Sequence, residues 1–184
     1  SGCSLNNLWP LEGCCNNLEE LNLYGCRHLQ GDLFPLKNFT ALRVLNMPEC
    51  QLLKGPLEPL KTCVALERVN LRNCINLVGT VEPFKHTLKL THLLISSTFA
   101  SMGIYGSLQP LTRCKALIEL DIRNCNEIDD AAFVLGEMPD SLNVHWMEDR
   151  KERSASGSID SSLDDLTAAE IVIDKEYEEG EIFD

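Results

Sequence analysis

The sequence predicts an α/β solenoid in which short coils stack side by side and share one curved parallel β-sheet. Three observations predict this class: a repeat, its leucine pattern and a second recurring block. The segment LEELNLYGC at 18–26 recurs as LRVLNMPEC at 42–50, LERVNLRNC at 66–74, LTHLLISST at 90–98 and LIELDIRNC at 117–125. The leading leucines are 24, 24, 24 and 27 residues apart, and a worn copy begins at Leu142, 25 residues further on. Such a period is typical of a repeat array.

The leucines inside each copy predict a strand. Those at the fourth and sixth positions alternate with a period of two, so they point to one face of a short strand and form the core. The residues at positions three, five, seven and eight should then face outward, on the concave side. A single coil of 24 residues buries too little apolar surface to offset its backbone entropy. Only stacked neighbours can stabilise it.

The second block predicts the opposite, convex side. It reads LQGDLFPL at 29–36, LLKGPLEPL at 52–60, LVGTVEPF at 77–84 and IYGSLQPL at 104–111, and an incomplete copy, LWPL, stands at 8–11. Its glycines fit turns with positive φ, and the following prolines should stop a helix from propagating: Gly31, Gly55, Gly79, Gly106; Pro35, Pro59, Pro83, Pro110. We therefore expect loops and short 3₁₀ turns there. The incomplete first copy suggests an earlier repeat or a cap upstream.

These residues resemble the leucine-rich-repeat family, whose pattern is LxxLxLxx(N/C)xL. The resemblance covers about residues 5–147, and four of the five full copies carry Cys at the Asn/Cys position: Cys26, Cys50, Cys74, Cys125. The second block is similar to that of the longer, plant-type repeat, with Pro displaced by two residues. The fifth repeat, CNEIDDAAFVL at 125–135, resembles the cysteine-containing subclass found beside F-box motifs.

Charge divides the chain into two predicted parts. The net charge is −12; residues 1–147 carry 15 acidic and 12 basic residues, net −3, whereas 148–184 carry 13 and 4, net −9. We predict a repeat domain at 1–147, with about six strands and an incomplete first repeat, and an acidic tail at 148–184. An acidic chain disfavours nucleic acid as a partner. The sequence contains neither a membrane-length apolar run nor a recognisable leader, although one could have been removed upstream.

Catalytic and metal-binding patterns are missing from the sequence, so we predict no enzyme, no cofactor and no metal. The nine cysteines follow the repeat, and the four histidines lack metal-site spacing. We expect free, buried thiols and an intracellular, reducing compartment. Neighbouring strands are nevertheless close enough for a disulfide, which leaves oxidised pairs open.

Two surfaces of the repeat domain are candidate partner sites. The outward positions on the concave side are Glu20, Asn22, Tyr24, Val44, Asn46, Glu49, Arg68, Asn70, Arg72, Asn73, His92, Leu94, Ser96, Glu119, Asp121, Arg123 and Asn124. Arg68, Arg72, His92 and Arg123 give this face a basic centre that suits a carboxylate-bearing segment, unless it is an ordinary solvated face. The insertion at 97–106 adds Phe99, Met102 and Tyr105, which either anchor a contact or cover their own core.

The acidic tail is the third candidate. Ser162 and Asp165 resemble a capping box that would open a short helix at 163–173. The tail then interleaves acids with Tyr177, Ile182 and Phe183. We expect it to dock on a basic surface of another protein subunit, with these apolar side chains as anchors, unless it is simply solvated.

The function favoured by these features is a non-catalytic protein-interaction module, in an accessory or scaffold subunit of a larger complex. One alternative, implied by the resemblance to plant-type repeats, is a receptor domain that recognises a ligand or peptide. A third, implied only by the fifth repeat, is substrate recognition for ubiquitin ligation. Fold alone does not decide among them.

Overall fold

The computed structural model describes residues 5–13, 15–98 and 100–146, and the chain divides into two compact units, Ser1–Trp146 and Met147–Asp184. The predicted tail helix at 163–173 lies outside the described residues, as do Phe99, Tyr177, Ile182 and Phe183. Within the described part, no helix is long and apolar enough to cross a membrane.

The repeat domain is a leucine-rich-repeat solenoid. Its main sheet has six parallel strands: β1 (Glu20–Asn22), β2 (Val44–Asn46), β4 (Arg68–Asn70), β6 (His92–Leu94), β8 (Glu119–Asp121) and β10 (Asn143–His145). The strands pair in register, so that Leu21 faces Leu45, Leu45 faces Val69, and Leu93 faces Leu120. The copies beginning at Leu18, Leu42 and Leu66 therefore supply adjacent parallel strands, as predicted.

The last copy, however, begins one residue earlier than predicted. Asn143 pairs with Glu119 and His145 with Asp121, which puts the first repeat position at Ser141, 24 residues after Leu117, and not at Leu142. Because successive strand residues alternate between faces, a shift of one residue moves every side chain of the strand to the other face. His145 consequently points to the same side as Asp121.

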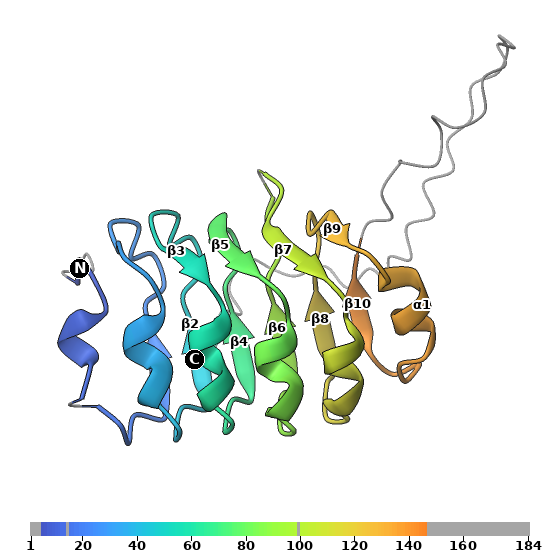
Figure 1. Ribbon diagram of the computed structural model, residues 1–184, viewed down its shortest axis with the longest axis horizontal. Coiled ribbons are helices and arrows are strands. Elements are labelled where there is room, and N and C mark those ends of the chain that lie inside the picture. The colour runs from blue at the N-terminus through green and yellow to red at the C-terminus, as the bar shows by residue number, and fades with distance from the viewer. Residues whose placement is uncertain (1–4, 14, 99, 147–184) are drawn as a thin grey trace, which may run out of the picture. The chain divides into compact units, whose positions relative to one another are not determined.

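A second parallel sheet lies along another edge of the coils, where only loops and turns were predicted. It contains β3 (Lys54–Pro56), β5 (Asn76–Gly79), β7 (Gly103–Gly106) and β9 (Glu127–Ile128). Figure 1 shows these strands along the upper edge, with the main sheet behind. Leu77 and Ile104 from this sheet are fully buried. Each strand has two to four residues, and the neighbouring coils supply its hydrogen bonds.

The side opposite the main sheet carries the predicted 3₁₀ helices (Figure 1): η1 (Trp9–Leu11), η2 (Phe34–Asn38), η3 (Glu58–Thr62), η4 (Glu82–His86) and η5 (Gln109–Arg113). The fifth repeat places an α-helix, α1 (Ala131–Gly136), after β9. The four predicted glycines do have positive φ. The prediction for the prolines was wrong in detail: each is the second residue of a 3₁₀ helix, where its missing N–H is not needed, so it starts the helix.

Cysteines recur at the same position in successive coils and form columns, of which Cys26, Cys50, Cys74 and Cys125 make one. The thiols of Cys50, Cys74 and Cys125 contact the neighbouring coil. The thiol of Cys74 lies 3.0 Å from the Met47 carbonyl oxygen, and that of Cys125 lies 3.3 Å from the Ile95 carbonyl oxygen. Burial raises the pKa of Cys63 to about 11 and that of Cys125 to about 12, so these thiols stay protonated. Six described cysteines are free, as expected: Cys15, Cys50, Cys63, Cys74, Cys114 and Cys125.

Cys26 differs from the other cysteines of its column, because it is disulfide-bonded. The sequence-based expectation of free thiols is therefore wrong for Cys26. What distinguishes Cys26 structurally is its place in the first full copy. Its counterparts Cys74 and Cys125 donate to the main strand segment of the coil before, whereas the coil before Cys26 has no such strand in the described residues.

Candidate interaction surface on the main sheet

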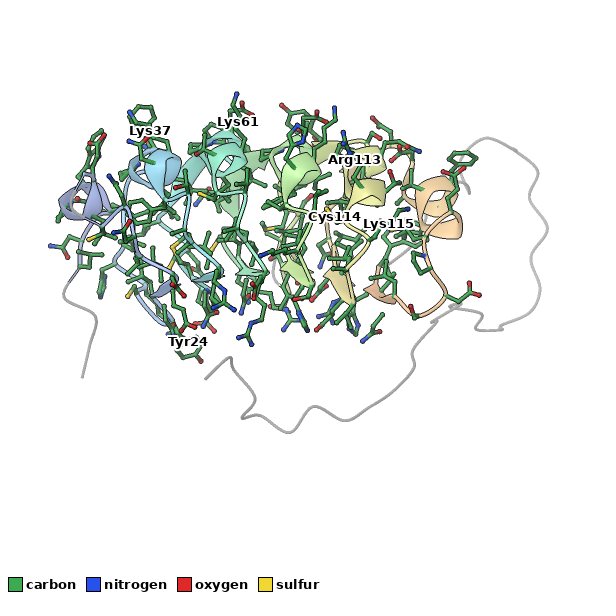
Figure 2. All side chains as sticks on the ribbon, turned by 90° about the horizontal axis from the view of Figure 1, so that it is seen from below. Tyr24, Lys37, Lys61, Arg113, Cys114 and Lys115 are labelled. Carbon is green, nitrogen blue, oxygen red and sulfur yellow. The ribbon has the colours of Figure 1, made fainter. Side chains whose placement is uncertain are left out.

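The outward side of the six-stranded sheet, called the sheet face below, is more enclosed than the sequence predicts. Figure 2 shows Tyr24 on this side of the coils and Lys37, Lys61 and Arg113 on the helix side. Six side chains predicted to be exposed on the sheet face are buried: Val44, Asn46, Asn70, Leu94, Ser96 and Asp121. Strands about 4.8 Å apart bring side chains at the same repeat position into contact, so central positions are covered by their neighbours.

A ladder of amides occupies the part of the face formed by β1, β2 and β4. The side-chain nitrogen of Asn46 donates to the oxygen of Asn22 at 3.1 Å, and that of Asn70 donates to the oxygen of Asn46 at 3.0 Å. The oxygen of Asn70 accepts the backbone N–H of Arg72 at 3.2 Å. The polar groups of this region are therefore engaged with one another.

A charged cluster occupies the other part, and its centre is Asp121. Arg123 donates from Nε to Oδ1 of Asp121 at 2.9 Å and from Nη2 to Oδ2 at 2.8 Å. Arg72, two strands away, donates from Nε to Oδ2 at 2.9 Å. The intervening coil carries the small residue Ser96 after β6, at the repeat position equivalent to those of Arg72 and Arg123, which leaves room for the arginine side chains. One carboxylate thus holds two guanidinium groups.

Asp121 remains ionised in this setting. Burial by itself would raise its pKa, but the hydrogen bond from Arg123 and the charges of Arg72 and Arg123 hold the pKa below its ordinary value. The Asp121 side chain is 0% exposed, whereas those of Arg72 and Arg123 are 36% and 41% exposed. The acid is buried beneath two accessible bases.

Glu119 lies beside this centre, between two imidazole rings. Its Oε2 is 3.8 Å from Nε2 of His92, and its Oε1 is 3.7 Å from Nε2 of His145 and 3.6 Å from Nη2 of Arg72. Nε2 of His145 is buried and has no hydrogen-bond partner among the described residues. Burial lowers the pKa of His92, opposed by the charge of Glu119 and supported by that of Arg68. His92 is therefore a neutral neighbour of Glu119 at neutral pH.

The structure brings together three of the predicted partner residues. Arg72, His92 and Arg123 belong to one cluster, and Arg68 pairs with His92 in the strand register. Tyr24 is half-exposed at the far end of the face, on the β1 segment. The prediction missed Glu119, Asp121 and His145 as members of the cluster. The acids stood among the outward positions, and the alignment of Glu119 with His92 and Arg68 at the third repeat position was the available signal.

Two of the residues that were candidate anchors in the insertion of the fourth repeat are described, and they differ in exposure. Met102 is 1% exposed and packs in the core, so it covers its own repeat and is not a partner anchor. Its backbone N–H donates to the Asn124 carbonyl, which draws this end of the insertion against the next coil. Tyr105, on β7, is 48% exposed, but it lies in the second sheet and is not part of the sheet face.

The described residues contain no group of three or more His, Cys, Asp or Glu side chains arranged to hold a metal ion. The contacts in the cluster are ion pairs and hydrogen bonds.

Comparison with solved structures finds similar chains that include two internalins from Listeria monocytogenes. An internalin C2 has 20% sequence identity and a TM-score of 0.47, over 66% of this chain and 53% of its own. An internalin F has 14% identity and a TM-score of 0.28, over 72% of this chain and 56% of its own. No protein-family model and no curated protein matches the sequence. This chain spans about half the length of the internalin chains, and the fold assignment follows from its own repeat and strand pairing.

Proposed function

We propose that this chain is a non-catalytic protein-interaction module whose sheet face holds an acidic segment of a protein partner. The observation that carries the proposal is the pair of accessible guanidinium groups, Arg72 and Arg123, fixed on the buried carboxylate of Asp121. A hydrogen-bonded sheet offers a rigid platform, and fixed charges favour a partner of opposite charge. An accessory or scaffold subunit of a larger complex is the role that fits such a platform.

The experiment compares two matched variants in partner capture. The tagged chain is isolated under native conditions from its source cells, and co-purifying proteins are identified and quantified. Arg72→Gln removes one charge from the sheet face, whereas Lys61→Gln removes one charge from the helix side, where Lys61 pairs with Glu58 at 2.6 Å. Loss of a partner with Arg72→Gln but not with Lys61→Gln supports the proposal. Equal capture by the two variants contradicts it.

The acidic tail is a second proposed contact, with a basic surface of another subunit as its target. It depends on the charge of residues 148–184 and on Tyr177, Ile182 and Phe183 in the sequence. Deletion of 155–184 should weaken assembly while leaving the repeat domain folded. Unchanged assembly would exclude the tail as the main tether.

The compartment is also a proposal. Six free cysteines support an intracellular, reducing location, and the disulfide of Cys26 is the observation against it. That disulfide favours the alternative of an extracellular receptor domain. A count of free thiols in denatured, unreduced protein separates the two.

A further inference from the structure

We propose that the guanidinium groups of Arg72 and Arg123 form a preorganised fork that binds a carboxylate, such as a Glu or Asp side chain of an extended peptide. The inference rests on the proposed function and specifies the ligand chemistry of the same face. It goes beyond charge complementarity, because it assigns the recognition to the particular geometry that Asp121 imposes.

Arg72 and Arg123 keep hydrogen-bond donors that Asp121 does not use. A guanidinium group has five N–H donors and two edges that can each bind a carboxylate. Both arginines point the Nε and Nη2 edge at Asp121, with the donor–acceptor distances between 2.8 and 2.9 Å. The Nη1 groups of both have no hydrogen-bond partner among the described residues. Each arginine therefore keeps its Nη1 donors for an incoming anion, and Oε1 of Glu119 lies 3.6 Å from Nη2 of Arg72.

The side chains of Arg72 and Arg123 are both accessible to solvent and held in place. Asp121 is fully buried, whereas about two-fifths of each arginine side chain is exposed, so the unused edges face solvent. Arginine loses considerable side-chain entropy when it is fixed in a complex. Here Asp121 has already fixed both side chains, and the entropy cost of binding is correspondingly smaller.

The part of the sheet face around Arg72 and Arg123 has a small positive charge. Among the described residues, the outward positions of β4, β6, β8 and β10 and the residues that follow them carry three positive charges (Arg68, Arg72, Arg123) and two negative charges (Glu119, Asp121), a sum of +1 with the histidines left out of the count. An anion is attracted to this sum. Glu119 and Asp121 nonetheless disfavour a doubly charged group at the two guanidinium groups, so a singly charged planar carboxylate fits better there than a phosphate.

The test uses short peptides as probes: acetylated hexaglutamate, hexaglutamine of the same length, and a peptide with one phosphoserine. Binding is followed by the NMR signals of the arginine Nε–H groups and by calorimetry. We expect hexaglutamate to shift the signals of Arg72 and Arg123, and hexaglutamine to leave them unchanged. Arg72→Gln should weaken hexaglutamate binding about tenfold or more, and Lys61→Gln should not. Tighter binding of the phosphoserine peptide would overturn the carboxylate assignment.

Two further variants separate geometry from charge. Asp121→Asn raises the net charge of the cluster by one, so simple attraction predicts tighter binding, whereas loss of the fixed fork predicts weaker binding. Arg72→Lys keeps the charge but loses the fork, and it should weaken binding as Arg72→Gln does. We expect weaker binding in both cases. Tighter binding by Asp121→Asn, or wild-type affinity of Arg72→Lys, would refute the fork, and Arg72→Lys decides if Asp121→Asn does not fold.

The outcomes distinguish this inference from the proposed function. If a native partner depends on Arg72 while hexaglutamate does not bind, the sheet face is the interaction surface and the ligand class is wrong. If hexaglutamate binds as expected while partner capture is insensitive to Arg72, the fork exists and the proposed use of the face is wrong.

Discussion

Arg72 and Asp121 are 49 residues apart in the chain, yet Nε of the arginine lies 2.9 Å from Oδ2 of the buried carboxylate. The bond passes over β6, the strand between them. It therefore joins the third and fifth repeats, which are not adjacent in the sequence. Arg123 binds the same carboxylate from its own repeat. This relationship sets both the stability of the sheet face and the position of its accessible charges.

Asp121 should contribute a pH-dependent part of the stability. Its pKa is depressed in the folded state, so its contribution is fully present above the unfolded pKa of about 3.9 and is lost as the pH falls through the folded value. Asp121→Asn should lower the free energy of unfolding at pH 7 by about 2 kcal/mol, because a charged hydrogen-bond acceptor is lost. Urea unfolding from pH 7 down to about pH 2 should show the two proteins converging. A constant difference across this range would contradict the ion-pair account.

His92 should titrate below its ordinary pKa, and the neighbouring charges should shift it in opposite directions. Burial lowers the pKa, Glu119 raises it and Arg68 lowers it. Glu119→Gln should therefore lower the pKa of His92 further, and Arg68→Gln should raise it. NMR titration of the imidazole C–H signals measures both. A rise in the His92 pKa on removal of Glu119 would show that the pair is arranged differently.

The same shift predicts a loss of stability in weak acid. As the pH falls below about 6.5, the unfolded chain takes up a proton at His92 before the folded chain does. The free energy of unfolding therefore falls as the pH drops, and it stays lowered once the pH has passed below the folded pKa. His92→Gln should reduce the fall in unfolding free energy between about pH 7.5 and 5.5, whereas His28→Gln, in a loop between β1 and η2, serves as the control. An equal fall in both variants would remove His92 from the account.

The residue before each column cysteine shows where a glycine would help. Gly25, Glu49, Asn73 and Asn124 all have φ between 59° and 71°, a left-handed conformation that costs a glutamate about 1–2 kcal/mol. Glu49→Gly should therefore stabilise the domain by about 0.5–1 kcal/mol, less the exposed ion pair of Glu49 with Arg27 at 2.6 Å. Arg27→Gln removes that ion pair alone and is the matched control. Urea midpoints measure both, and a destabilised Glu49→Gly in the Arg27→Gln background would contradict the assignment.

Gly103 should be the glycine least tolerant of a side chain on the second sheet. A Cβ there would lie 2.7 Å from Cγ1 of Val78 and 3.2 Å from the Leu77 carbonyl oxygen. Gly103→Ala should cost about 1–3 kcal/mol of unfolding free energy, and adding Val78→Ala should recover part of it. Gly136→Ala, at a position with no atom within 4 Å, should be neutral or stabilising. Additive effects of the two substitutions in the double variant would argue against the contact.

The repeat made most of the fold predictable, because each buried position recurs at a fixed spacing. The sequence did not predict the second sheet, since strands as short as Glu127–Ile128 depend on bonds from the neighbouring coils. Nor did it predict His145 on the sheet face. Leu142 looked like the first residue of the last copy, and only the pairing of Asn143 with Glu119 reveals the one-residue shift.

The site was predictable in composition but not in geometry. The pattern placed Arg72, His92 and Arg123 on one face, since the odd-numbered positions of each repeat point to the same side of the sheet. It could not show that Arg72 reaches past β6, because the reach depends on the size of Ser96 and on the burial of Asp121. It also counted Asp121 as exposed. Burial on a parallel sheet depends on both neighbouring strands, and a single repeat carries no information about them.

Removing Cys26 should increase the number of free thiols, although it removes a cysteine. The chain has nine cysteines, and a disulfide at Cys26 leaves 9 − 2 = 7 free thiols in denatured, unreduced protein. Cys26→Ala has eight cysteines and releases the former partner, so eight thiols should be counted. Cys74→Ala, a free cysteine of the same column, should instead lower the count to six. Thiol titration in denaturant decides whether Cys26 is oxidised or reduced. Nine thiols in the wild-type protein and eight in both variants would mean that Cys26 is reduced. The proposal of a reducing compartment would then stand.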